Sequence, residues 1–297
     1  VKTKNFSWDV NFTFAFNRST VVKLPANGED QNRIGGNYIY DPATGETRKV
    51  GGFAEGERFG QRWAYSMIGV YATDEDAKDA PFDENAKGRQ KKGGDAIWAD
   101  LDNDGRITNK DMIFMGYIRP DKMGGMANTF RYKGFTLRAV VDYAVGHMID
   151  NGFRARSNGS ARNNNMTITD QLSDETWKKP GDIASIPRYT VQSDVDYDFR
   201  NHLRWDNQIG STGYASNNSL YYSKGDFLAF REVSPNYQLN PRFLKNTFIK
   251  GVDLFAGVFN IGYITAYDGL MPEIYDGFDR GSYPRPRQVS FSVKATF

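Results

Sequence analysis

The stretch Trp8–Phe16 reads Trp-Asp-Val-Asn-Phe-Thr-Phe-Ala-Phe, and its large apolar side chains fall on every second position. Successive side chains of a β-strand point to opposite faces of a sheet, so this period of two predicts a strand with one apolar and one mostly polar face. The same alternation recurs at 135–146 and 289–297. The three stretches together predict an all-β protein.

Five further segments are weaker strand candidates, at residues 61–72, 126–133, 219–224, 226–239 and 249–261. Pro235 lies within the segment 226–239. Because proline has no backbone N–H to give to the ladder, we expect a bulge or a local break there. The glycine-containing triplets Lys133-Gly134-Phe135 and Lys224-Gly225-Asp226 predict tight turns between strands.

The composition excludes several classes of protein. The 297 residues include 21 phenylalanines and 17 tyrosines, which argues against a disordered chain. The sequence has no run of about 18 apolar residues, so a helical membrane protein is excluded. The absence of cysteine excludes disulfides and thiol-based metal chemistry. A formal net charge of +2 is too balanced to predict nucleic acid as a partner.

Long polar segments separate the predicted strands, at residues 25–60, 73–125 and 148–218. Connections of this length are uncommon in compact soluble domains, whereas outer-membrane barrels combine short periplasmic turns with long extracellular loops. The strongest strands reach about 9–11 residues, the length that crosses a bilayer when tilted. Aromatic residues near the strand ends resemble the aromatic belts of membrane interfaces. The pattern favours a transmembrane β-barrel over a soluble β-sandwich with inserted loops.

Residues Asp100–Asp111 have the spacing of a calcium-binding loop. Gly105 allows the sharp turn that such a loop needs. The predicted metal ligands are four carboxylates and one backbone carbonyl, supplied by Asp100, Asp102, Asp104, Asp111 and Arg106, respectively. No convincing helix precedes the loop, so we expect Ca²⁺ to act as a structural staple rather than as a switch. The alternative is an Asp-rich turn that is stabilised by its own hydrogen bonds and holds no ion.

Motifs of catalysis are absent from the sequence. It contains no G-x-S-x-G, no H-E-x-x-H and no phosphate-binding P-loop. The two histidines, His147 and His202, have no partners at the spacing of a catalytic triad. We therefore expect that the protein is not an enzyme.

The order of motifs along the whole chain resembles the C-terminal part of SusC/RagA-type TonB-dependent outer-membrane transporters. Each motif is modest by itself, but their order together with the strand at the end of the sequence is specific. The motifs lie at Phe6–Phe12, Glu55-Gly56, Ile68–Ala77, Asp100–Asp111, Met115-Gly116, Pro120, Tyr132–Phe135, Leu254–Ile261, Thr265–Glu273, Tyr283–Arg287 and Phe297.

The resemblance implies that residues 1–297 are the C-terminal segment of a 22-stranded antiparallel β-barrel, with a calcium-loop-like extracellular insertion at about 73–125. It implies TonB-driven import of oligosaccharides or peptides across the outer membrane of a Gram-negative bacterium. A SusD-like surface lipoprotein would cover the extracellular loops. The segment would supply about eight strands, so the remaining barrel strands, the plug and the TonB contact would come from an upstream or separate segment.

The alternation also assigns the strand faces within such a barrel. We expect Phe12, Phe14, Val141, Phe291 and Phe297 to face outer-membrane lipid. We expect Asn11, Thr13, Asp142 and Ser292 to face a polar lumen or the plug.

Two departures from the family pattern concern local strand geometry, namely Gly262, where the family usually has a large apolar residue, and Pro235. Two other functions stay open on the sequence. One is a self-contained small outer-membrane barrel that folds alone in detergent. The other is a soluble, calcium-stabilised β domain that binds glycans and needs no detergent.

Overall fold

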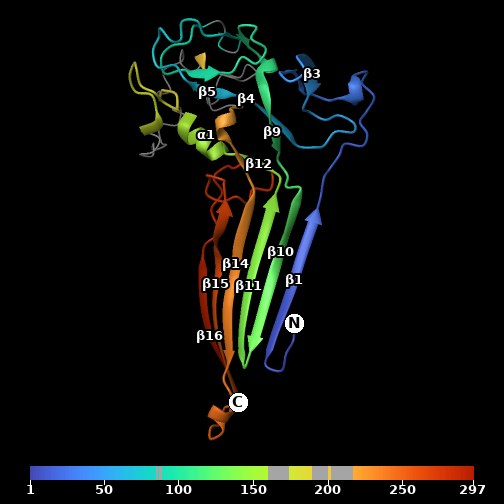
Figure 1. Cartoon of the computed structure of the whole chain (residues 1–297), viewed down its shortest axis with the longest axis vertical. Coiled ribbons are helices and arrows are strands. Elements are labelled where there is room, and N and C mark those ends of the chain that lie inside the picture. The colour runs from blue at the N-terminus through green and yellow to red at the C-terminus, as the bar shows by residue number, and fades with distance from the viewer. Residues whose placement is uncertain (85, 87–88, 160–173, 189–199, 202–216) are drawn as a thin grey trace.

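Six long strands form one open antiparallel sheet in the computed structural model, which describes all residues except 85, 87–88, 160–173, 189–199 and 202–216 (Figure 1). The strands, in their hydrogen-bonded order, are β1 (Phe6–Phe16), β10 (Lys122–Tyr132), β11 (Phe135–Val145), β14 (Phe227–Gln238), β15 (Gly251–Thr265) and β16 (Gln288–Thr296). Each strand pairs antiparallel with the next. Within the described residues β1 and β16 form the two edges of the sheet, so it does not close on itself.

The sheet has six strands, whereas the sequence predicted about eight. The segment 61–72 is not one strand but two short ones, β4 (Gln61–Tyr65) and β5 (Met67–Val70). The segment 219–224 contains the 3-10 helix η4 (Ser219–Tyr221) and the short β13 (Tyr222–Lys224). These segments lie outside the large sheet because their aromatic residues pack into a different core, in which Tyr65 and Tyr221 are fully buried.

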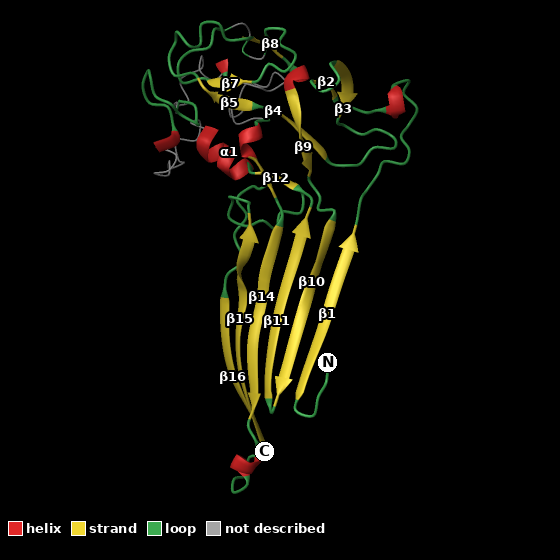
Figure 2. Cartoon of the chain, viewed as in Figure 1, coloured by secondary structure: helices red, strands yellow, loops and turns green. Residues whose placement is uncertain are grey.

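The connections between the six strands differ sharply at the two ends of the sheet (Figure 2). The connections 17–121, 146–226 and 266–287 gather at one end. The connections 133–134 and 239–250 lie at the other, and the second contains the 3-10 helix η5 (Pro241–Leu244). Lys133 and Gly134 have φ values of 44° and 85°, as a two-residue hairpin turn requires.

The second predicted tight turn, at 224–226, does not join two neighbouring strands of the sheet. It passes the chain from β13, which pairs with β12 (Met148–Asp150), into β14.

The three long connections fold into a cap at one end of the sheet (Figure 1). Its strands form two-stranded pairs: β2 with β3, β4 with β9, β5 with β7, β6 with β8, and β12 with β13. The elements not yet given are η1 (Asp30–Asn32), β2 (Asn37–Asp41), β3 (Glu46–Val50), β6 (Phe82–Asp83), β7 (Ala96–Trp98), β8 (Arg106–Ile107), η2 (Asn109–Asp111), β9 (Met112–Tyr117) and α1 (Gly152–Gly159).

The cap has a hydrophobic core of its own. The core takes side chains from the first and second long connections, including Ile39, Tyr65, Trp98, Ile107, Met112, Ile186 and Tyr221. A second, smaller cluster of Ile149, Tyr267 and Ile274 joins the second long connection to the third. The described parts of the long connections therefore pack together into one body rather than forming separate loops.

The expected break at Pro235 is wrong. Pro235 pairs with Leu137 of β11, and the register of β14 with β15 is the same at Val233 and Asn236. The irregularity lies at Arg231, where the pairing shifts toward both β11 and β15. Opposite it, β15 accommodates the shift with left-handed Asn260 (φ 52°) and with Gly262, at a φ of 157° that side chains disfavour. Such bulges are known to redirect a side chain next to a functional surface.

Among the described residues, no helix combines the length and the apolar character needed to cross a membrane.

Candidate functional site

One face of the sheet is apolar across successive strands. Residues that pair directly in an antiparallel sheet lie on the same face. One cross-strand row joins Phe12, Met126, Val141 and Phe230. The side chains on this face are strongly exposed, with Phe12 at 62% and Phe291 at 78% of their full accessibility. Soluble monomers rarely leave such a continuous apolar surface in water, so this face has the character of a lipid-facing barrel wall.

The opposite face of the sheet carries a cluster of charges centred on Arg231. The row next to the apolar one joins Thr13, Gly125, Asp142 and Ala229. The Arg231 side chain lies on this face, where its Nε is 2.7 Å from Asp142 Oδ2. The alternating apolar and polar side chains of the strands thus lie on two opposite faces of the sheet, as the sequence predicted.

Arg231 also holds the third long connection against the sheet. Its Nη1 donates to Glu273 Oε1 at 2.6 Å, and the Tyr263 hydroxyl donates to the same oxygen at 2.5 Å. Arg285 Nη2 lies 3.0 Å from the other oxygen of Glu273. Burial by itself raises the pKa of Glu273, but the hydrogen bonds from Arg231 and Tyr263 outweigh it and hold the pKa below its ordinary value. The connection 266–287 therefore lies over the polar face and is fixed there by charge-assisted bonds.

The Asp-rich loop lies in the cap, next to its core. Ile107, in the middle of the loop, is 1% exposed and belongs to the core cluster. Gly105 has a φ of 77°, and open space surrounds the position of a Cβ there. Glycine is therefore required at this position by backbone conformation and not by lack of room.

The structure brings together three of the predicted metal ligands. One carboxylate oxygen from each of Asp100, Asp102 and Asp104 lies within 4.8 Å of the other two. Asp100 Oδ1 is buried and has no hydrogen-bond partner among the described residues. Lys110 Nζ lies 3.7 Å from Asp102, so one cation already offsets part of the negative charge. This cluster is the part of the predicted site that offers converging hard oxygens to an ion.

The other two predicted ligands make different contacts. Asp111 is 1% exposed, and its two carboxylate oxygens accept hydrogen bonds from the backbone N–H groups of Leu101 and Thr108, both at 2.8 Å. Burial raises the pKa of Asp111, although these two bonds oppose the shift. The Arg106 guanidinium lies 2.6 Å from Glu84, pairing the loop to its neighbour. The Asp111 side chain thus joins the two ends of the loop by binding the backbone N–H groups of Leu101 and Thr108.

Charged residues at the base of the cap were not predicted from the sequence. Asp150 of β12 is largely buried and hydrogen-bonded to Tyr222 of β13, with Arg62 nearby. Burial raises the pKa of Asp150 to about 6, against the opposing influence of Tyr222 and Arg62. Asp150 belongs to no local motif, and the motif Thr265–Glu273 does not reveal that Glu273 binds Arg231, 42 residues away in the sequence. Of the two histidines, His147 is buried beside Gly225, and His202 lies outside the described residues.

These features define a class of structure: a segment of a transmembrane β-barrel wall, with an apolar face, a charged face and a folded cap of long connections at one end.

Comparison with known proteins agrees with this class. No protein-family model matches the chain. The whole chain aligns over 335 residues with the TonB-dependent receptor P39 of Formosa agariphila, at 26% identity. It also aligns over its whole length with the TonB-dependent receptor SusC of Bacteroides thetaiotaomicron, at 22% identity. A chain of the RagAB peptide transporter has the same fold, with a TM-score of 0.64 at 16% identity over the full chain.

The chain resembles the SusC/RagA-type TonB-dependent receptors along its entire length, as its motifs predicted. It spans 29% of the P39 receptor, 25% of SusC and 28% of the RagAB chain, so it corresponds to less than a third of each. These relatives are receptors and a transporter rather than enzymes, which confirms the expectation from the sequence.

The raised pKa of Asp150 predicts a pH dependence of the cap. Below about pH 4 the carboxyl is protonated in both the folded and unfolded states, so it costs nothing. As the pH rises from about 4 to about 6, the unfolded state gives up this proton while the folded state keeps it, so stability falls; the loss is complete above the folded-state pKa of about 6. Asp150→Asn should remove this loss, which is about 3 kcal/mol above pH 7.

Hydrogen exchange of residues 148–150 and 222–224, measured between pH 4 and 8 and corrected for the intrinsic rate, checks this prediction. Asp79→Asn, which makes the same change at an exposed residue of the cap, serves as the control and should keep the wild-type dependence. An Asp150→Asn profile that matches the wild type would contradict the assignment.

Proposed function

We propose that the chain is the C-terminal part of the barrel wall and extracellular cap of a TonB-dependent importer in the outer membrane of a Gram-negative bacterium. The observation that carries the proposal is the sheet itself: one strongly exposed apolar face, one charged face, and long connections gathered at a single end. The resemblance to TonB-dependent receptors over the whole chain supports it.

The two open edges of the sheet support the need for further strands. An unpaired strand edge in hydrocarbon leaves backbone N–H and C=O groups without partners, at a cost of several kcal/mol for each group. In the described chain β1 and β16 are such edges. We infer that strands from outside residues 1–297 pair with them, and that the plug and the TonB contact also come from outside this segment.

We further propose that the imported nutrient is an oligosaccharide or a peptide, and that a SusD-like lipoprotein covers the cap. The peptide alternative draws support from the likeness to a chain of the RagAB peptide transporter, and the oligosaccharide alternative from the resemblance of the sequence motifs to the SusC/RagA-type family. The packed cap, held together by its own core, provides a preformed surface for such a lipoprotein.

The two other functions inferred from the sequence fit the structure less well. A self-contained small barrel requires β1 to pair with β16, and these strands are instead the two edges of the sheet. A soluble glycan-binding domain would expose side chains such as Phe12, Phe14 and Phe291 to water.

The face assignment predicts opposite outcomes for two neighbouring residues of β16. Phe291→Lys places a charge on the lipid-facing side and should cost about 2–4 kcal/mol if it lies near mid-membrane. Ser292→Lys places the same charge on the polar side and should be tolerated. The amount of heat-modifiable, folded protein in outer-membrane fractions measures the difference, and equal yields of the two variants would refute the assignment.

The transport proposal predicts a selective loss of uptake. A strain that lacks the protein should fail to import either labelled oligosaccharides or labelled peptides, and loss of TonB should give the same defect. Complementation with the wild-type gene should restore uptake. Uptake of both nutrient classes at wild-type rates in the deletion strain would contradict the proposal.

We also propose that the Asp-rich loop binds Ca²⁺ as a structural staple of the cap. The converging oxygens of Asp100, Asp102 and Asp104 and the buried, unpartnered Asp100 Oδ1 support it. Because the same loop carries Ile107 in the core, an ion there would fix the position of that core residue. We retain Asp111 and the Arg106 carbonyl as proposed ligands, reached by a rearrangement of the bonds that Asp111 now makes.

The calcium proposal predicts a gain in stability on adding the ion. With a dissociation constant of about 10⁻⁴ M, as in extracellular calcium modules, about 10 mM Ca²⁺ should stabilise the cap by about 2.7 kcal/mol. Asp102→Asn with Asp104→Asn should abolish the gain, whereas Asp79→Asn, an exposed change in the same connection, should keep it. Calorimetric titration and thermal unfolding check the result, and equal Ca²⁺ responses in all variants would oppose it.

A further inference from the structure

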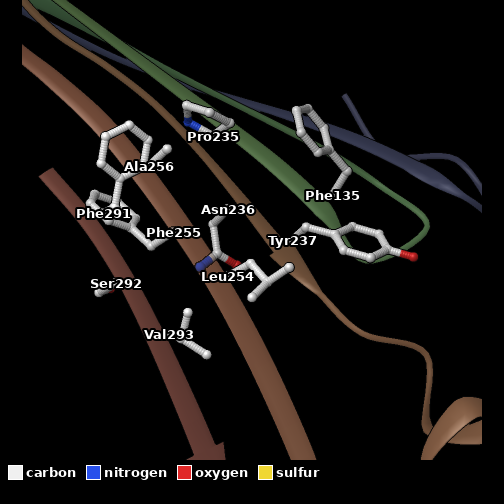
Figure 3. A pocket seen from close by; sticks show the side chains of 10 residues that line it. All are labelled: Phe135, Pro235, Asn236, Tyr237, Leu254, Phe255, Ala256, Phe291, Ser292 and Val293. Carbon is white, nitrogen blue, oxygen red and sulfur yellow. The ribbon is translucent and has the colours of Figure 1, made fainter. Parts of the chain in front are cut away.

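A shallow hollow opens on the apolar face of the sheet, near the end with the short connections (Figure 3). Its volume is about 310 Å³. The hollow exists because Pro235 and Ala256 have short side chains, while larger ones surround them. The surrounding apolar side chains come from four adjacent strands and include Phe135, Tyr237, Leu254, Phe291 and Val293.

The connection 239–250 extends beyond this end of the sheet (Figure 1). It contains Arg242, Lys245 and Lys250 and no aspartate or glutamate. Two aromatic side chains of the same connection are strongly exposed, Phe243 at 73% and Phe248 at 78%. The Phe248 ring stacks on Phe297, with ring centroids 5.6 Å apart and planes at 13°. The turn 239–250 therefore exposes both basic and aromatic side chains.

The hollow and the basic turn are adjacent. Tyr237 and Leu254 line the hollow and flank the connection 239–250 on either side. At about 3.4 Å for each residue of a strand, the hollow begins roughly 7 Å from the turn, because Tyr237 lies two residues before residue 239. The Tyr237 ring points its hydroxyl along the sheet toward the end that carries the short connections (Figure 3). An amphipathic ring in this place is typical of the boundary between hydrocarbon and headgroups.

We propose that the hollow and the turn together form a binding site for an anionic phospholipid. One acyl chain lies in the hollow between Tyr237 and Phe291, and Arg242 and Lys245 bind the headgroup phosphate. Phe243 and Phe248 lie at the level of the headgroups. This inference rests on the proposed function, because it needs the apolar face of the sheet to contact lipid.

Charge and shape favour a phospholipid over other occupants. The hollow is lined almost wholly by apolar side chains and belongs to an apolar face that continues across all six strands. If this face contacts lipid, the molecule that occupies the hollow must come from the lipid phase. Three basic residues without an acidic one attract an anion, and each basic residue near an anionic membrane surface contributes about a fivefold increase in affinity. A phospholipid supplies both parts, an apolar chain and an anionic phosphate, in one molecule.

The full-length protein that carries this chain, reconstituted in bilayers, allows a local test. Phe248→Trp places a fluorophore in the turn, and the difference from the parent protein isolates its emission. Brominated phosphatidylglycerol or brominated phosphatidylcholine is then added as the quencher. From the quenching in the Phe248→Trp protein, we expect the association constant of phosphatidylglycerol to exceed that of phosphatidylcholine at least about fivefold.

Two variants in the Phe248→Trp background locate the site. Arg242→Glu with Lys245→Glu should abolish the preference for phosphatidylglycerol. The matched control is Lys2→Glu with Lys4→Glu, which makes the same charge change at exposed residues of the same end; these two residues line a second cavity that shares only Phe135 with the hollow. It should keep the preference. Ala256→Phe, which fills the hollow, should lower quenching by both lipids.

The outcomes separate this inference from the proposed function. Trp8 lies on the apolar face of β1, 37% exposed, and its quenching is obtained by comparison with Trp8→Phe. If Trp8 is not quenched, the sheet does not face lipid and both proposals fail. If Trp8 is quenched but position 248 shows no lipid preference, or loses it equally in the Lys2/Lys4 variant, only the phospholipid site is refuted. If a protein partner covers the turn, neither lipid will quench the fluorophore at position 248. This outcome would also refute the phospholipid site.

Discussion

Backbone hydrogen bonding in the absence of water is the constraint on which the rest of the structure depends. In hydrocarbon every N–H and C=O must find a partner within the protein, and antiparallel pairing of β1, β10, β11, β14, β15 and β16 meets this need for all inner strands. The pairing also aligns side chains in rows, so that Phe12, Met126 and Val141 reach one face together. The apolar face, the charged face and the direction of the long connections all follow from this ladder.

The cap depends on the ladder in turn. Its core takes residues from connections that are far apart in sequence, such as Ile39, Ile107 and Tyr221. Only the pairing of the strands returns these connections to the same end of the sheet. The third connection is then held against the sheet, because Arg231 of β14 binds Glu273, whose other carboxylate oxygen pairs with Arg285 of the same connection. A buried carboxylate between two cations would be costly to leave unpaired, so the cap and the polar face form one charged unit.

Alternation predicted the strands where it was long and regular, as in Trp8–Phe16 and Val289–Phe297, because these strands have one face in an apolar medium. At 61–72 the structure does have strands, but they are the short β4 and β5 of the cap, where Tyr65 is buried, and not one strand of the large sheet. The sequence also placed the irregularity at Pro235, which lacks a donor, and missed Arg231. At the bulge the Arg231 side chain meets Asp142 and Glu273 from other segments, and these contacts have no local signature.

The sequence by itself determined the all-β class, the two faces of the strands and the carboxylates of the Asp-rich loop, since each depends on residues close together in the chain. The resemblance to TonB-dependent receptors also came from local motifs in a fixed order. Only the tertiary structure decided that the long loops share one core, that Glu273 binds Arg231, and that a hollow lies beside the turn 239–250. These features arise from side chains that the sheet brings together across tens of residues, and their energies depend on burial that no short stretch of sequence specifies.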